Sequence, residues 1–195
     1  MPSNHPSRRL PLMAALVVGA AAAPAAQAFD FQGSKALVAV TADGQRLSIG
    51  SVSFQPEGAS PGGKVRFKTT SNPKAFTDYF LSMREFKCLP AAREVTCQVP
   101  YPYANPATVT PDNLAWLEHS LLFLTKSPAE FGAKLWNGVY FKFSVRGNAL
   151  VGSPMAIDLN EISAPPDDPT VPPFGPDHRQ DMPAGARWIT ELRIE

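Results

Sequence analysis

The chain has 195 residues, of which 44% are hydrophobic and 18% are charged, and its formal net charge is +1. This near-neutral charge argues against binding to nucleic acid or to acidic membrane surfaces, because both reward a strong positive charge. The hydrophobic content is that of a folded globular protein rather than a disordered one.

The first 28 residues have the three parts of a secretory signal peptide. Arg8 and Arg9 precede an apolar run from Leu12 to Ala23, and the small residues Ala26 and Ala28 follow it. The run has about 12 residues, whereas a helix that spans a membrane needs about 20. We therefore predict a signal peptide at 1–28, a single periplasmic or secreted domain at 29–195, and no stable membrane insertion after cleavage.

The chain has two cysteines, Cys88 and Cys97, and both follow the predicted signal peptide. In an oxidising compartment, such a pair favours a disulfide over two free thiols. Pro90 between them indicates a turn, so the disulfide is expected to link the two strands of a hairpin. A redox-active pair is the alternative, although such pairs are usually spaced Cys-x-x-Cys.

The first part of the predicted domain has the pattern of a β-sheet. Residues 35–42 are rich in β-formers, and Asp43-Gly44 after them favours a hairpin turn. Farther on, Lys64, Arg66 and Lys68 alternate with apolar residues, which predicts a strand with one basic face. That face is either a binding surface for an anionic polymer or the solvated side of a sheet.

Two helices are predicted in the middle of the chain. At 110–125, four leucines recur at helical spacing after Thr110 and Pro111, which suit a helix start. At 128–136, Ser127 and Glu130 form the pattern of a capping box. The second helix is expected to end before Gly138.

The last part of the chain is predicted to return to β-structure. Residues 139–146 alternate, Gly147-Asn148 favours a turn, and residues 150–159 return as the second strand of a hairpin. Residues 164–183 contain seven prolines and form a long predicted loop before a final strand at 188–194. The fold class expected from this order is α+β: a mainly antiparallel sheet or open barrel, built from hairpins and covered by the two helices.

No pattern of catalytic, metal-binding or cofactor-binding residues stands out. After the signal peptide the only histidines are His119 and His178, and neither has the spacing of a helical metal pair. Glu118 next to His119 would point in a different direction on a helix. We therefore assign no catalytic residues, no metal and no cofactor; this leaves enzymatic activity undecided and favours a non-enzymatic protein.

Aromatic residues are the best candidates for a ligand-binding surface. Tyr101 and Tyr103 belong to an extended Pro-Tyr-Pro-Tyr segment, and Trp136 and Tyr140 lie where the second predicted helix meets a strand. Aromatic side chains at such junctions can line a pocket for an apolar ligand. Ordinary packing between a helix and a sheet is the alternative.

Several segments together resemble a family of uncharacterised exported bacterial proteins. They include Glu85-Phe86-Lys87-Cys88 with Cys97, the Pro-Tyr-Pro-Tyr segment, and Trp136-Asn137-Gly138. The resemblance covers about residues 80 to 195. It implies a single domain with a signal peptide, and it brings no established activity and no catalytic residues.

The sequence therefore leaves three functional hypotheses. The first is a non-enzymatic exported domain that binds a small apolar ligand or a cell-envelope component through the four aromatic residues. The second is a protein–protein interaction or inhibitor module that presents the proline-rich loop or the disulfide hairpin to a protein partner. The third is a hydrolase that uses His119 or His178.

Overall fold

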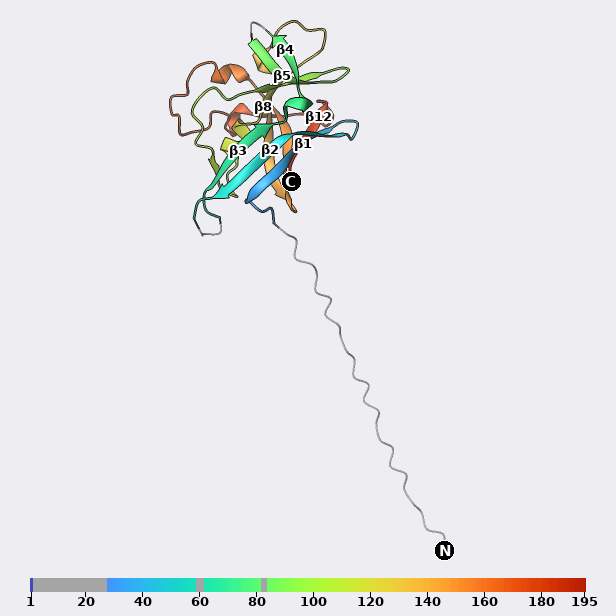
Figure 1. The fold of residues 1–195 in the computed structure, drawn as a ribbon, viewed down its shortest axis with the longest axis vertical. Helices are drawn as coiled ribbons and strands as arrows, with labels where there is room; N and C mark the ends of the chain where they lie inside the picture. Colours follow the sequence, from blue (N-terminus) through green and yellow to red (C-terminus); the bar gives the residue numbers. More distant parts are fainter. Residues whose placement is uncertain (2–27, 59–61, 82–83) are drawn as a thin grey trace.

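The computed structural model describes residues 1, 28–58, 62–81 and 84–195. The predicted signal peptide lies outside these residues, apart from Met1 and Ala28. Within the described part, one 12-stranded sheet holds the strands together (Figure 1), and all strand pairs given for it are antiparallel.

The strands are β1 (Gly33–Thr41), β2 (Arg46–Pro56), β3 (Val65–Ser71), β4 (Thr77–Leu81), β5 (Arg84–Pro90), β6 (Val95–Val99), β7 (Thr108–Val109), β8 (Leu122–Lys126), β9 (Gly138–Arg146), β10 (Ala149–Ile157), β11 (Gln180–Asp181) and β12 (Ile189–Ile194). The helical segments are the helix α1 (Ala115–His119) and the 3-10 helices η1 (Pro73–Ala75), η2 (Leu135–Asn137), η3 (Leu159–Ile162) and η4 (Pro176–His178).

The strand order shows how the two ends of the domain meet. It runs β4-β5-β6-β8-β9-β10-β12-β1-β2-β3-β7, and β11 is added to β10. The last strand, β12, thus lies between β10 and the first strand, β1. The C-terminal strand therefore joins the strands from β1 to β3 to the continuous run from β4 to β10.

The sheet curls around one hydrophobic core and carries a second core on its other face. The first core combines side chains of β1–β3 with those of β8–β10, although these strands are far apart in the strand order. The sheet must therefore curl so that these strands face each other. The helix α1 contacts both β7 and β9. The second core lies against β5, β6, β8 and β9 and includes Cys88, Cys97, Leu159 and Phe174.

The expected α+β fold with two covering helices is wrong, and the end of the first predicted helix is a strand. Only Ala115–His119 is α-helical within 110–125, whereas Leu122–Lys126 forms β8. Phe123 of β8 packs in the first core, and Leu122 and Leu124 pack in the second. In a strand that is buried on both faces, apolar and polar residues do not alternate. The spacing of the leucines therefore fitted a helix as well as a strand.

The second predicted helix, at 128–136, is also absent. Glu130 does accept a hydrogen bond from the backbone N–H of Ser127 at 2.7 Å, as a capping box requires. The chain then turns at Gly132, where φ is 73°, and only η2 follows. A positive φ cannot continue a right-handed helix, so the cap begins a turn instead.

Several local predictions are confirmed. The hairpin after Gly138 is present as β9 and β10, which pair from Gly138–Ile157 to Arg146–Ala149. Cys88 and Cys97 face each other across β5 and β6 and form a disulfide. Lys64, Arg66 and Lys68 are exposed, while the residues between them are buried.

Residues 164–183, called the strap below, cross the outer face of the sheet. Regular structure in the strap is confined to η4 and the two-residue strand β11. The strap is fixed to the domain by Phe174, which is 2% exposed and belongs to the second core. It thereby covers part of β9.

Candidate functional site

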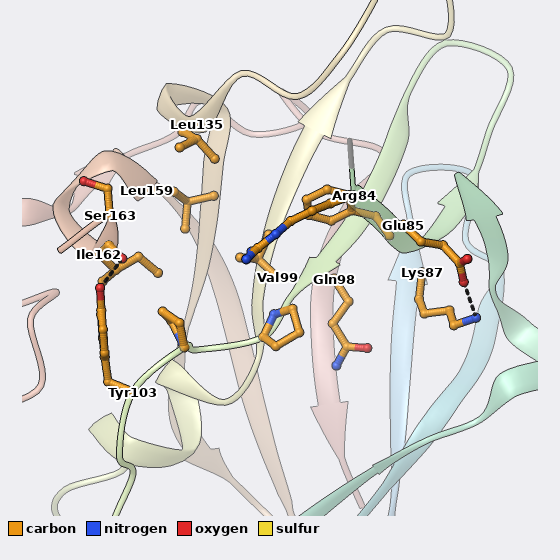
Figure 2. Close-up of a pocket in the computed structure, with 13 residues that line it drawn as sticks. Arg84, Glu85, Lys87, Gln98, Val99, Tyr103, Leu135, Leu159, Ile162 and Ser163 are labelled. Atoms are coloured by element: carbon orange, nitrogen blue, oxygen red, sulfur yellow. Dashed lines mark hydrogen bonds and ion pairs between the residues drawn. The ribbon is translucent and has the colours of Figure 1, made fainter. Parts of the chain in front are cut away.

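A groove with a largely apolar lining opens between β5, β6 and η3 (Figure 2). Its volume is about 620 Å³, which falls within the range of small-molecule binding sites. The side chains that line the groove are Arg84, Glu85, Phe86, Lys87, Gln98, Val99, Pro100, Pro102, Tyr103, Leu135, Leu159, Ile162 and Ser163.

Local sequence explains how the groove is left open. Pro100 and Pro102 cannot donate the hydrogen bonds of a strand, so the chain leaves the sheet directly after β6. On the opposite side, the side chain of Asp158 accepts a hydrogen bond from the backbone N–H of Asn160 at 2.9 Å and begins η3. The sheet and η3 therefore form two walls with apolar surface between them.

The rim on the β5 side carries charge. Lys87 pairs with Asp78 across the β4–β5 hairpin, and its Nζ lies 3.3 Å from the carboxylate of Glu85. These two carboxylates, Asp78 above all, raise the pKa of Lys87. Lys87 is thus neutralised locally, whereas Arg84 on the same strand has no ion-pair partner among the described residues.

Tyr103 connects the groove to the interior. Its ring lines the groove, and its hydroxyl donates a hydrogen bond to the carbonyl oxygen of Ile162 at 3.2 Å. The ring lies edge-on to Tyr101 with a centroid distance of 5.7 Å, and Tyr101 in turn lies 5.9 Å from the ring of His119. Burial raises the pKa of Tyr101.

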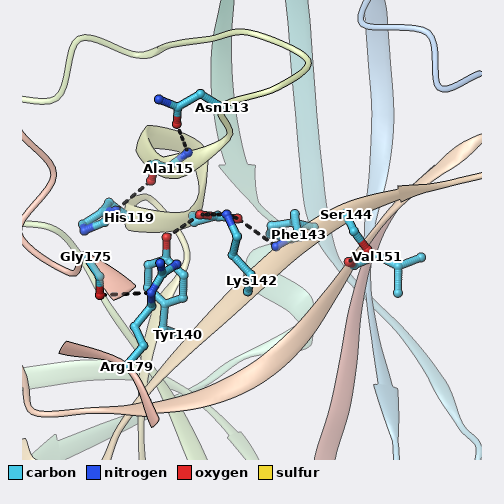
Figure 3. Close-up of polar contacts among 11 residues, drawn as sticks. Asn113, Ala115, His119, Tyr140, Lys142, Phe143, Ser144, Val151, Gly175 and Arg179 are labelled. Atoms are coloured by element: carbon cyan, nitrogen blue, oxygen red, sulfur yellow. Dashed lines mark hydrogen bonds and ion pairs between the residues drawn. The ribbon is translucent and has the colours of Figure 1, made fainter. Parts of the chain in front are cut away.

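Beyond Tyr101 lies a group of fully buried polar side chains, Glu118, His119 and Tyr140, called the buried centre (Figure 3). Glu118 accepts hydrogen bonds from the hydroxyl of Tyr140 and, at 2.8 Å, from the backbone N–H of Phe143. The Nζ of Lys142 lies 3.2 Å from the same carboxylate. These contacts of the Glu118 carboxylate are all made with residues of β9.

The Glu118 carboxylate takes the place of a strand partner that β9 lacks at Phe143. β9 pairs with β8 only at Val139 and Gly138, so the backbone N–H of Phe143 has no acceptor from β8. The carboxylate of Glu118 supplies that acceptor from α1. A buried N–H without a partner would cost about 1–3 kcal/mol, so Glu118 holds α1 against the sheet.

His119 is held between α1 and the strap. Its Nδ1 lies 2.7 Å from the carbonyl oxygen of Ala115, and its Nε2 accepts the backbone N–H of Phe174 at 3.0 Å. These partners require a neutral ring with the proton on Nδ1. Burial lowers the pKa of His119 to about 4. Both nitrogens are occupied inside the protein, which leaves neither free to act on a substrate.

Arg179 of the strap completes the buried centre. Its guanidinium lies 5.0 Å from the ring centroid of Tyr140, within the range of a cation–π contact. Its Nε donates a hydrogen bond to the carbonyl oxygen of Gly175 at 3.1 Å. Burial and the neighbouring Glu118 raise the pKa of Tyr140, so its hydroxyl stays protonated and can donate to Glu118.

The four aromatic residues expected to bind a ligand do not form one surface. Tyr103 lines the groove, Tyr101 lies behind it, and Tyr140 belongs to the buried centre. Trp136 is 62% exposed and lines a separate pocket of about 270 Å³ together with His178. The aromatic junction expected between Trp136 and Tyr140 is therefore divided between the surface and the interior.

Sequence reasoning missed most of the groove. Five of its apolar side chains were not candidates: Phe86, Val99, Leu135, Leu159 and Ile162. The two prolines after β6 were a usable signal of one wall of the groove, because they show that the strand ends there. The approach of η3 to β6 had no signal in the sequence, since more than 50 residues separate the two segments.

The described residues include no group of three or more His, Cys, Asp or Glu side chains placed to hold a metal ion. In the same part of the chain, no helix is long and apolar enough to cross a membrane. Comparison with protein-family models, with curated proteins and with solved structures finds no match. The resemblance to a family of exported bacterial proteins stays a prediction.

Proposed function

We propose that this protein is a binding domain for a small apolar ligand, and that the ligand occupies the groove between β5, β6 and η3. The observation that carries the proposal is the groove itself: about 620 Å³ of space with an apolar floor. A soluble domain seldom leaves a concave apolar surface of this kind without a use for it.

The walls of the groove are held in place before any ligand binds. The Cys88–Cys97 disulfide joins β5 to β6, and the hydroxyl of Tyr103 ties the segment after β6 to η3. Leu159 and Ile162 are anchored in the second core. A preorganised site loses less conformational entropy on binding, which favours affinity.

The protein is further proposed to work outside the cytoplasm. The disulfide supports this, because disulfides persist in oxidising compartments. The hydrolase hypothesis receives no support at His119, since both of its ring nitrogens are bonded within the fold.

A neutral fluorescent probe, N-phenyl-1-naphthylamine, tests the groove directly. We expect the purified protein to bind the probe, and Val99→Trp to weaken binding at least about tenfold because the indole fills the groove. Ser53→Trp adds the same side chain at an exposed position of β2, and it should bind the probe like the unmodified protein.

Two outcomes would contradict the proposal, provided thermal melting shows that the variants are folded. One is that no probe binds to the unmodified protein. The other is that Val99→Trp binds as tightly as Ser53→Trp. Native mass spectrometry of the purified protein adds a further readout, because a retained ligand would be released on unfolding.

A further inference from the structure

The groove has two chemically different sides (Figure 2). One side is formed by Leu135, Leu159 and Ile162, which offer only hydrocarbon surface. The other side, on β5 and β6, combines the apolar Phe86 and Val99 with polar and charged side chains, among them Arg84. A purely apolar ligand would leave the polar and charged side chains of this side facing its hydrocarbon.

Arg84 is the cation on this rim that lacks a carboxylate. Lys87, its neighbour on β5, is paired with Asp78 and lies 3.3 Å from Glu85. Among the described residues, Arg84 forms no ion pair, and its side chain extends from β5 across the groove toward Val99 (Figure 2). A guanidinium in this position can donate two parallel hydrogen bonds to a carboxylate.

The rest of the charged rim does not offer a site for a cation. Gln98 points away from Arg84 (Figure 2), and its side-chain oxygen accepts a hydrogen bond from the hydroxyl of Ser71 at 3.0 Å. Glu85 is engaged with Lys87, so Arg84 is the charged group of the rim that is left for a ligand. This charge distribution disfavours a cationic head group.

Resting on the proposed function, we propose that the ligand is a single-chain anionic amphiphile. Its acyl chain lies against Leu135, Leu159 and Ile162, and its carboxylate binds Arg84. Each side of the groove then meets a matching part of one molecule, and no charged group of the ligand is placed against hydrocarbon.

Isothermal titration with three twelve-carbon probes tests this assignment, with each ionic probe below its micelle concentration and the alcohol below its solubility limit. The probes are dodecanoate, dodecanol and dodecyltrimethylammonium, which differ in the charge of the head group. We expect dodecanoate to bind more tightly than dodecanol, and the cationic probe to bind most weakly. The preference for dodecanoate should fall as salt is added, because the rim is exposed.

Arg84→Gln and Lys87→Gln are a matched pair, because both remove one cation from the same strand. We expect Arg84→Gln to weaken dodecanoate binding about five- to tenfold and to leave dodecanol binding unchanged. Lys87→Gln should change dodecanoate binding less than about twofold, since Lys87 is already neutralised by Asp78 and Glu85.

The outcomes separate this inference from the proposed function. If dodecanol binds as tightly as dodecanoate, or if Arg84→Gln leaves dodecanoate binding unchanged, the anionic head is wrong and the apolar groove stands. If none of the three probes binds the folded protein although N-phenyl-1-naphthylamine does, the single-chain amphiphile is wrong and the apolar groove stands; if that probe does not bind either, both proposals fail.

Discussion

The groove and the buried centre are connected by a series of aromatic rings, yet they differ in which side chains they expose to solvent. In the groove, the partly exposed apolar side chains of Phe86, Val99 and Leu135 border about 620 Å³ of space. In the buried centre, the polar atoms of Glu118, His119 and Tyr140 are withdrawn from solvent and bonded to the protein. Tyr103 and Tyr101 connect the two regions.

This difference separates binding from stability. Changes in the groove should alter what the protein binds and leave the fold intact, because the altered side chains are partly exposed. Changes in the buried centre should alter the stability of the fold, because they leave buried polar groups without partners. The following variants test that separation.

The largest effect is expected for Glu118→Ala. It removes the acceptor for the hydroxyl of Tyr140 and the backbone N–H of Phe143, and it leaves Lys142 without its carboxylate. We expect the free energy of unfolding, measured by urea denaturation, to fall by about 3–5 kcal/mol. Glu118→Gln, which retains an acceptor oxygen, should lose less.

The matched control is Glu85→Ala, which removes an exposed carboxylate on the groove rim. It should change the free energy of unfolding by less than about 0.5 kcal/mol. Equal losses for the two alanine variants would show that Glu118 does not hold α1 to the sheet.

A smaller and pH-dependent effect is expected from His119. Burial lowers the pKa of His119 to about 4 in the fold, whereas an unfolded histidine titrates near its ordinary value of 6.5. Between these values only the unfolded chain takes up the proton. The contribution of His119 to the free energy of unfolding is therefore complete above about pH 6.5. It is lost as the pH falls toward 4, by about 3 kcal/mol in total, and does not change further below that pH.

Urea denaturation at several pH values from 7 to 4.5 measures this dependence. The lowered carboxylate pKa values of Asp43, Asp168 and Glu195 affect stability mainly below this window. His119→Gln keeps an acceptor for the backbone N–H of Phe174 and has no titrating ring. In this variant, the free energy of unfolding should no longer fall between pH 7 and pH 4.5. If it still falls, a group other than His119 causes the pH dependence.

The smallest effect is expected for Trp136→Ala. The indole is 62% exposed and lines a pocket separate from the groove. We expect a change in the free energy of unfolding of less than about 0.5 kcal/mol and unchanged binding of the neutral probe. Weaker probe binding in a folded Trp136→Ala variant would move the ligand to the Trp136 pocket and contradict the proposed groove.

Local patterns predicted those parts of the fold that depend on neighbours in the sequence. The β9–β10 hairpin followed from alternation around Gly147-Asn148, and the disulfide followed from two cysteines that flank a turn. The separation of Glu118 from His119 also followed from helix geometry: Glu118 bonds to β9, and His119 bonds to the strap.

The helical prediction at 110–125 shows where such reasoning stops. Leu114, Leu117, Leu121 and Leu124 repeat at helical spacing, but the chain changes from α1 to β8 between the second and the fourth. The leucines of β8 are buried because a second core covers the outer face of the sheet. Without that cover, Leu122 and Leu124 would face solvent. No local sequence pattern predicts that a second core covers this face.

The sequence by itself determined the hairpins at Asp43-Gly44 and Gly147-Asn148, the disulfide hairpin and the approximate position of the strap, because turn residues and alternation act over a few positions. Tertiary structure decided which side chains face the groove and which form the buried centre. Both sites join segments that are distant along the chain: η3 with β6, and α1 with β9 and the strap. Their contacts depend on how the sheet curls and what covers it, so they exist only once the whole domain has folded.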